Sequence, residues 1–244
     1  MTTMPLEICD DRDGAQHLTR PFVITFSGID GAGKTTQIEL LHAYLSNQGY
    51  RVGLYTFWDH VAVLPNLRAE VGAKSVLGIR ASPLSPLVVK NNKHVRKWYL
   101  SLARSHLYAL DVARLRRLFN GLGNENYDFV IFDRYVYDQL ANISSTKKIS
   151  RAYIRALLHF TPRPDLALIL DASPAEAFAR KPEYPLDFMY RYQRTFLALR
   201  EVIPSLTVIA SSTVDAVATQ ILTALHNTYR SVPSNLTAEL TDIP

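Results

Sequence analysis

Eight consecutive residues, Gly28 to Thr35, read G-x-x-x-x-G-K-T, which is the spacing of a phosphate-binding P-loop. Glycines let the backbone curl closely around phosphate oxygens with its N–H groups pointing inward. In such a loop we expect Lys34 to reach the β- and γ-phosphates and the Thr35 hydroxyl to bind Mg²⁺. The motif predicts a nucleoside triphosphate site formed by Gly28, Ile29, Asp30, Gly31, Ala32, Gly33, Lys34, Thr35 and Thr36.

The segments that flank this loop have the character that the motif requires. Residues 21–26 are apolar and partly β-branched, as in a buried strand. Residues 36–45 carry apolar side chains at helical spacing, and Gly49 supplies a stop signal. A strand, a glycine loop and a helix in this order favour a real P-loop over a chance match.

A second group of chemically active residues follows the apolar run 129–132, which ends in Asp133-Arg134-Tyr135. The carboxyl ends of parallel strands form the edge where α/β sheets bind ligands. There Asp133 can hold Mg²⁺ or orient an attacking oxygen, and Arg134 can bind a phosphate through two parallel hydrogen bonds. An ordinary surface ion pair is the alternative, and the P-loop in the same chain favours the functional interpretation.

The rest of the chain predicts the sheet that positions these groups. Apolar runs at 129–132 and 166–170 are typical of parallel strands buried on both faces. Strands alternating with helices predict an α/β fold of the P-loop NTPase type, with a parallel sheet of about five strands flanked by helices. Further strands are expected at 51–57 and 208–209, and helices at 95–119, closed by Gly121 and Gly123, and at 214–229.

Length and composition predict one domain over residues 21–230, with a loose leader at 1–20 and a frayed tail at 231–244. The net charge of +5 comes from dispersed basic residues, which an acidic substrate explains as well as nucleic acid does. The sequence shows no recognised nucleic-acid-binding module or arginine-rich tract, so we expect no nucleic-acid partner. The one cysteine, Cys9, excludes an internal disulfide and a multi-cysteine metal site. No run has the length of a membrane span and the N-terminus lacks a signal pattern, so we expect a cytoplasmic protein.

Over about residues 22–226 the chain resembles the thymidylate kinase family of P-loop nucleoside monophosphate kinases. The resemblance implies ATP and Mg²⁺ as cofactors, a nucleoside monophosphate as phosphoryl acceptor, and a homodimer formed through the helix at 95–119. A core-facing helix explains the pattern at 95–119 equally well. The matching segments are 26–37, Asp133-Arg134-Tyr135-Val136, Pro164-Asp165-Leu166, Leu170-Asp171 and 174–180.

The resemblance also implies roles for individual residues. Asp30 resembles the carboxylate that faces the acceptor, and Arg134 the arginine near the transferring phosphates. Arg180 resembles the start of a lid, here near 180–187, which would supply the positive charge that this P-loop lacks between its glycines. Lys181 and Arg191 are further lid candidates, although a solvated helix face explains Arg191 equally well. Tyr137, with Trp58 and Tyr135, is a candidate for stacking on the acceptor base, and core packing is the alternative.

The departures from the family pattern fall on the acceptor side. Ser27 replaces an acidic residue, residues 56–59 replace an Arg-Glu-Pro segment, and Val112 and Ile143 replace an arginine and a glutamine. Arg104 and Arg114 can substitute for that arginine, or can simply cover an exposed helix face. A site that hydrogen-bonds a base discriminates strongly between bases, so these changes concern the identity of the acceptor and leave ATP binding intact.

Two other functions remain open from the sequence. The acceptor can be another phosphorylated metabolite or a sugar-type alcohol, although Arg134 favours one that already bears phosphate. The chain can also be a sensor that binds ATP or GTP without transfer. Its one near match to a guanine-reading motif, residues 92–95, lacks the aspartate.

Overall fold

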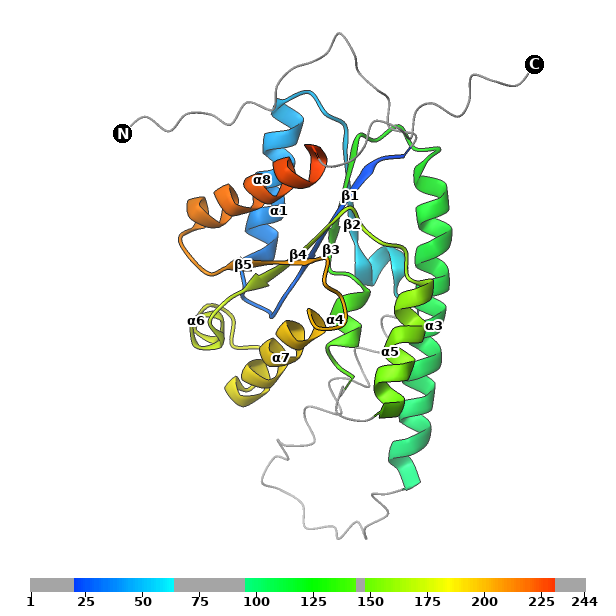
Figure 1. Ribbon diagram of the computed structural model, residues 1–244. Coiled ribbons are helices and arrows are strands. Elements are labelled where there is room, and N and C mark those ends of the chain that lie inside the picture. Colours follow the sequence, from blue (N-terminus) through cyan, green and yellow to red (C-terminus); the bar gives the residue numbers. More distant parts are fainter. Residues whose placement is uncertain (1–19, 64–94, 144–147, 231–244) are drawn as a thin grey trace, which may run out of the picture.

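The computed structural model of the protein describes residues 20–63, 95–143 and 148–230 (Figure 1). In the helix that begins at Val95, side chains are described from residue 105 onward. The predicted tail and nearly all of the predicted leader lie outside the described residues, as do residues 64–94 and 144–147.

Five strands form one parallel sheet. The predicted fold class, a parallel α/β sheet of about five strands flanked by helices, is therefore confirmed. The strands lie in the order β2-β3-β1-β4-β5, so β1 is central and the chain reverses its direction of winding beside it. The P-loop follows β1 at the carboxyl edge, where open α/β sheets place their ligands. The strands are β1 (Phe22–Ser27), β2 (Val52–Thr56), β3 (Phe129–Asp133), β4 (Leu166–Asp171) and β5 (Leu206–Ala210).

Helices cover both faces of this sheet (Figure 1). Helices α1 and α8 pack together on one face, and α3, α4, α5 and α7 cover the other. Their bounds are α1 (Lys34–Asn47), α3 (Val95–Leu122), α4 (Val136–Leu140), α5 (Lys148–Phe160), α6 (Pro174–Arg180), α7 (Leu186–Leu199) and α8 (Val214–Arg230), with a π-helical turn, η2 (Phe57–Val61), after β2.

The core consists of two apolar layers, one on each side of the sheet. Successive residues of β1 alternate between them: Phe22 and Ile24 face the α1–α8 layer, and Val23 faces the α3–α5 layer. Every residue of β1 is buried because helices lie on both sides. The carboxyl end of this strand, with the loop that follows, is therefore held on a rigid support.

All five predicted strands and the three predicted helices are present in the structure, with ends shifted by a few residues. The helix expected at 95–119 runs through Gly121 to Leu122, so the prediction that Gly121 closes it is wrong, whereas Gly123 directly follows its last residue, as predicted. One glycine costs a helix only about 1 kcal/mol, which packing against the sheet offsets. Helices α4 to α7 were not predicted, although α5 has a strongly amphipathic pattern.

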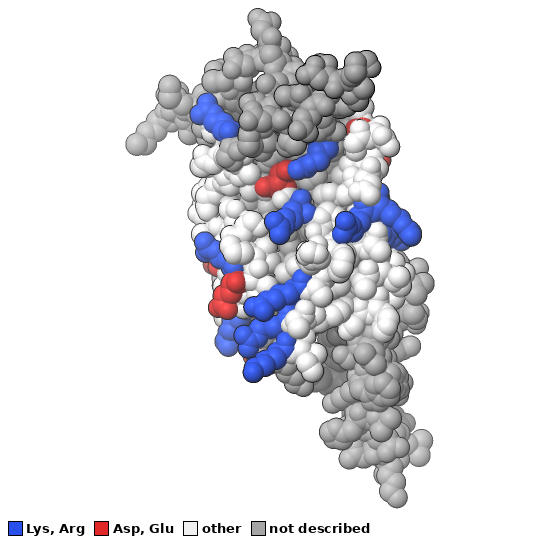
Figure 2. Space-filling model, turned by 45° about the vertical axis from the view of Figure 1, so that its right-hand side comes forward, with Lys and Arg blue, Asp and Glu red and all other residues white. Residues whose placement is uncertain are grey.

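Basic side chains spread over the outer surface of α3 and α5. Figure 2 brings this side of the molecule forward and shows Lys and Arg side chains with few Asp or Glu between them. Helix α5 has no acidic residue at all. Part of the net positive charge therefore lies on this helical surface, on Arg114, Arg116, Arg117, Lys148, Arg151 and Arg155, all of them exposed.

Candidate active site

The P-loop has a backbone conformation that only glycine adopts readily. Gly28, Gly31 and Gly33 have φ values of 141°, 81° and 86°. A Cβ atom on Gly28 would lie 2.7 Å from the carbonyl oxygen of Leu170, and one on Gly31 would lie 2.5 Å from that of Ala177. The loop therefore sits against β4 and α6 so closely that a side chain at either glycine would displace backbone.

Lys34 begins α1 and turns its ammonium group back into the loop. Its Nζ donates hydrogen bonds to the carbonyl oxygens of Gly28 and Ile29, both at 2.9 Å. The side chain is only 7% exposed. Burial, together with the charge of Arg134, lowers the pKa of Lys34 from 10.5 to about 8, against the opposing effect of nearby carboxylates. A buried cation thus lies where the P-loop motif predicts phosphate oxygens.

Arg134 follows β3 in a left-handed backbone conformation. In the part of the chain that the structure describes, it is the one non-glycine residue with a positive φ, 69°. Its backbone N–H donates to the carbonyl oxygen of Phe26 at 2.9 Å, which holds the turn against the end of β1. Such a conformation costs about 1–2 kcal/mol, and here it directs the guanidinium over the P-loop.

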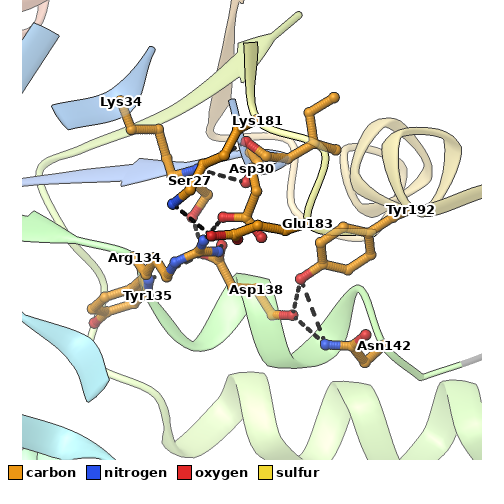
Figure 3. A network of polar contacts seen from close by, with 12 residues as sticks. Ser27, Asp30, Lys34, Arg134, Tyr135, Asp138, Asn142, Lys181, Glu183 and Tyr192 are labelled. Carbon is orange, nitrogen blue, oxygen red and sulfur yellow. Dashed lines mark hydrogen bonds and ion pairs between the residues drawn. The ribbon is translucent and has the colours of Figure 1, made fainter. Parts of the chain in front are cut away.

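The Arg134 guanidinium joins two carboxylates from different elements (Figure 3). Its Nη2 contacts Oδ1 of Asp30 in the P-loop. Its Nη1 donates to Oδ1 of Asp138 in α4 at 3.0 Å. These carboxylates help to raise the pKa of Arg134 despite its burial, so the guanidinium stays charged. The fold thus brings together Asp30 and Arg134, two of the predicted site residues.

Asp138 is a site residue that sequence reasoning missed. Its side chain is 1% exposed, and Oδ2 accepts hydrogen bonds from Ser27 Oγ at 2.7 Å and from the backbone N–H of Tyr135 at 3.2 Å. Burial raises the pKa of Asp138, while Arg134, Lys34 and Ser27 oppose this shift. The usable signal was the acidic residue four positions after Arg134, in the first turn of the helix that follows it.

The predicted metal-binding residues lie at the same edge of the sheet. Thr35 is exposed at the start of α1, and Asp133 is partly exposed at the end of β3, close enough to Lys34 to influence its pKa. Among the described residues, no group of three or more His, Cys, Asp or Glu is placed to hold a metal ion. This donor set fits Mg²⁺, which commonly takes one or two protein ligands and completes its shell with phosphate and water.

The lid candidates lie at the end of α6, in the segment that joins α6 to α7, and within α7. Arg180 is exposed, and its Nε donates to the carbonyl oxygen of Glu176 at 3.3 Å. Lys181 forms an exposed ion pair with Glu183 at 3.0 Å, which raises its pKa, and the Asp30 carboxylate adds to that shift. Of the lid's basic residues, Lys181 thus shows an electrostatic link to the site. The Nε atom of the exposed Arg191 donates within α7, to the carbonyl oxygen of Asp187 at 3.4 Å.

The acceptor-side tyrosines are core residues. Tyr135 is fully buried and donates its hydroxyl to the carbonyl oxygen of Pro162 at 2.6 Å, so packing, not base stacking, accounts for it. Tyr137 is 3% exposed and packs on Tyr135 with ring centroids 5.0 Å apart. The acceptor-binding role of Tyr137 stays a prediction. Trp58, the third aromatic candidate, has an exposed side chain on η2.

Val112 stands where the family has an acceptor-side arginine, and Arg104 and Arg114 are the candidates to substitute for that arginine. Val112 is buried in the core, and Arg114 sends Nη1 to the carbonyl oxygen of Ala62 at 3.4 Å. The Arg104 side chain lies outside the described residues. Next to Val112, the buried Asp111 accepts a hydrogen bond from Gln139 Nε2 at 2.5 Å and another from the N–H of Val63 at 2.7 Å. This pair links α3, α4 and the end of η2.

The amino-acid sequence is similar to those of known proteins. No family model matches the chain. A probable thymidylate kinase of Pyrococcus abyssi is 30% identical over 161 residues, which are 66% of this chain and 70% of that protein. The thymidylate kinase of Prochlorococcus marinus is 30% identical over 218 residues, or 84% of this chain and 96% of that protein.

Solved structures agree on the fold. The thymidylate kinase of Candida albicans superposes with a TM-score of 0.58 at 22% identity, covering 86% of this chain and 93% of that one. The sheet order, the glycine loop and its buried lysine define a P-loop kinase, a class of phosphotransferases. Within that class the chain belongs to the thymidylate kinase family.

Proposed function

We propose that this protein transfers the γ-phosphoryl group of ATP to the phosphate of a nucleoside monophosphate in the presence of Mg²⁺, with dTMP as the first acceptor to test. The observation that carries the proposal is the Arg134 guanidinium, held between Asp30 of the P-loop and Asp138 of α4 beside the buried Lys34 ammonium. The relatives named thymidylate kinase support the choice of dTMP.

The transfer is an in-line exchange of one P–O bond for another. An oxygen of the acceptor phosphate attacks the γ-phosphorus, and the bond from that phosphorus to the β,γ-bridging oxygen breaks, giving ADP and a nucleoside diphosphate. Negative charge spreads over the γ-phosphoryl oxygens as the bonds exchange, so catalysis needs fixed cations and alignment. In the described part of the site, the buried Lys34 and the mostly buried Arg134 provide such cations.

We assign the predicted residues to roles on this basis. The backbone N–H groups of residues 28–36 and Lys34 hold the β- and γ-phosphates, and Arg134 binds the transferring phosphoryl group together with the acceptor phosphate. Asp30 faces the acceptor, and Arg180 and Lys181 belong to the lid that excludes water. Thr35 and Asp133 would hold Mg²⁺, which when bound neutralises charge on the phosphate oxygens.

Specificity for the acceptor base rests on side chains near the positions that depart from the family, and Gln139 is bonded to Asp111, which directly precedes one of them, Val112. The buried amide of Gln139 is the group best placed for a reading role, because its orientation is defined. A carboxylate only accepts hydrogen bonds, so the bond to Asp111 must come from Nε2, which leaves Oε1 as an acceptor. That Oε1 atom is buried and has no hydrogen-bond partner within the described part of the chain.

The homodimer and the cytoplasmic location stay predictions.

A coupled assay for ADP tests the proposal. The full chain is incubated with ATP, Mg²⁺ and one acceptor at a time: dTMP, dUMP, the other nucleoside monophosphates and several sugar phosphates. Lys34→Ala and Arg134→Ala should abolish the acceptor-dependent signal, and Arg117→Ala, on an exposed face of α3, should not. Turnover with a sugar phosphate and with no nucleotide would show that the protein is a kinase for another phosphorylated small molecule. ATP binding without acceptor-dependent ADP would favour the sensor and contradict the proposal.

A further inference from the structure

The two carboxylates that contact Arg134 differ sharply in exposure. The side chain of Asp30 is 19% exposed, and that of Asp138 is 1% exposed. Asp30 belongs to the loop that faces the ligand edge of the sheet, whereas Asp138 lies beneath the guanidinium in the first turn of α4 (Figure 3). One of the two partners of Arg134 is thus open to replacement by a ligand, and the other is enclosed.

We propose that Asp138 is a positioning residue whose buried carboxylate holds Arg134 over the P-loop while an acceptor phosphate takes the place of Asp30 on the guanidinium. This inference rests on the proposed function, because it assigns to Arg134 a phosphorylated acceptor. It adds a residue that neither the P-loop motif nor the Asp-Arg-Tyr motif contains.

Hydrogen bonds to both oxygens keep the Asp138 carboxylate in place. Oδ2 accepts from Ser27 at the end of β1 and from the backbone N–H of Tyr135, so Oδ1 is left to face Arg134. A buried carboxylate that loses its cation pays a large desolvation penalty, whereas a partly exposed one is solvated by water. An incoming phosphate therefore displaces Asp30 from Arg134 in preference to Asp138.

The backbone of Asp138 is tied to the helix that follows the lid. Its carbonyl oxygen accepts hydrogen bonds from the Tyr192 hydroxyl at 2.8 Å and from Asn142 Nδ2 at 3.0 Å. Tyr192 lies in α7, directly after the lid segment. The residue that orients Arg134 is therefore fixed from three sides: β1 through Ser27, the turn after α4 through Asn142, and α7 through Tyr192.

The contact between Ser27 and Asp138 permits an exchange experiment. Their side chains meet at 2.7 Å, so the double variant Ser27→Asp/Asp138→Ser keeps one hydroxyl and one carboxylate in the same contact. We expect Asp138→Ser and Asp138→Asn to raise the acceptor KM about tenfold or more while the ATP KM changes less than about threefold. Ser27→Asp alone places two carboxylates together and should also impair the enzyme. The double exchange should recover a large part of the loss.

A spectroscopic readout separates this proposal from the proposed function. The Arg134 guanidinium N–H signals, assigned by their loss in Arg134→Lys, should be protected from solvent exchange in the wild-type protein and lose that protection in Asp138→Asn. This measurement needs no turnover, so it holds even if no acceptor is phosphorylated. Thermal melting and ATP binding of each variant show that it is folded. Unchanged protection of Arg134 in Asp138→Asn, or a double exchange no better than the single variants, would overturn the proposal.

Discussion

The ammonium group of Lys34 and the guanidinium of Arg134 lie close enough in the active site for the charge of Arg134 to lower the pKa of Lys34. Burial contributes the larger part of that shift, and Asp138, Asp30 and Asp133 oppose it. Two cations held together cost stability in the absence of an anion. The same arrangement attracts a polyphosphate electrostatically, so binding of the anion should stabilise the protein.

The lowered pKa of Lys34 predicts a specific dependence of stability on pH. With a pKa of about 8 in the folded state and 10.5 unfolded, the unfolded chain binds more protons between these values, so stability contributed by this group rises with pH. The free energy of unfolding of the wild type, relative to Lys34→Met, should increase by about 2 kcal/mol between pH 8 and pH 10. Urea unfolding of both proteins measures this difference, and a flat difference would contradict the assignment.

Gly31→Ala should destabilise the protein by more than about 3 kcal/mol, because it combines a positive φ of 81° with a Cβ only 2.5 Å from the Ala177 carbonyl oxygen. Gly49→Ala is the matched control, since Gly49 has a φ of 85° but open space around the new methyl group. It should cost only about 1–2 kcal/mol. Equal costs in denaturant unfolding would mean that α6 can move away from the P-loop.

Arg134→Lys should reduce kcat/KM for the acceptor about 100-fold, although the positive charge is retained. The planar guanidinium reaches Asp30 and Asp138 with different nitrogens, and a lysine ammonium cannot reproduce that fork. The affinity for ATP should stay within about threefold of the wild type, because Lys34 and the loop amides provide most of the phosphate contacts. Steady-state kinetics with titration of each substrate distinguishes these effects.

Asp111→Ala should destabilise the protein by about 2–4 kcal/mol, because Asp111 is fully buried and accepts hydrogen bonds from Val63 N–H and Gln139. Asp215→Ala, in the exposed first turn of α8, is the control and should cost less than about 1 kcal/mol. Thermal and denaturant unfolding measure both. A loss of acceptor affinity in Asp111→Asn, with stability preserved, would further support a reading role for Gln139.

Local pattern sufficed for the sheet and for the elements around the P-loop. Buried parallel strands are short, continuous apolar runs, and the two most apolar runs after the loop became β3 and β4. The order of strand, glycine loop and helix likewise predicted the P-loop conformation, because a P-loop depends on the backbone of one continuous segment. Helices α4 and α6 were missed because they are only 5 and 7 residues long and carry little periodic signal. Helices α5 and α7, with 13 and 14 residues, have amphipathic patterns from which they could have been predicted.

The partners of Arg134 were decided by the tertiary structure. Ser27 and Asp138 are 111 residues apart and meet because β1 and β3 pair in parallel and α4 starts at their common edge. The left-handed backbone of Arg134 arises from its hydrogen bond to Phe26, which no local pattern encodes. The amino-acid sequence therefore determined which motifs and candidate groups the chain carries. Burial and long-range pairing decided which carboxylates contact Arg134, because both depend on chain segments that meet only after folding.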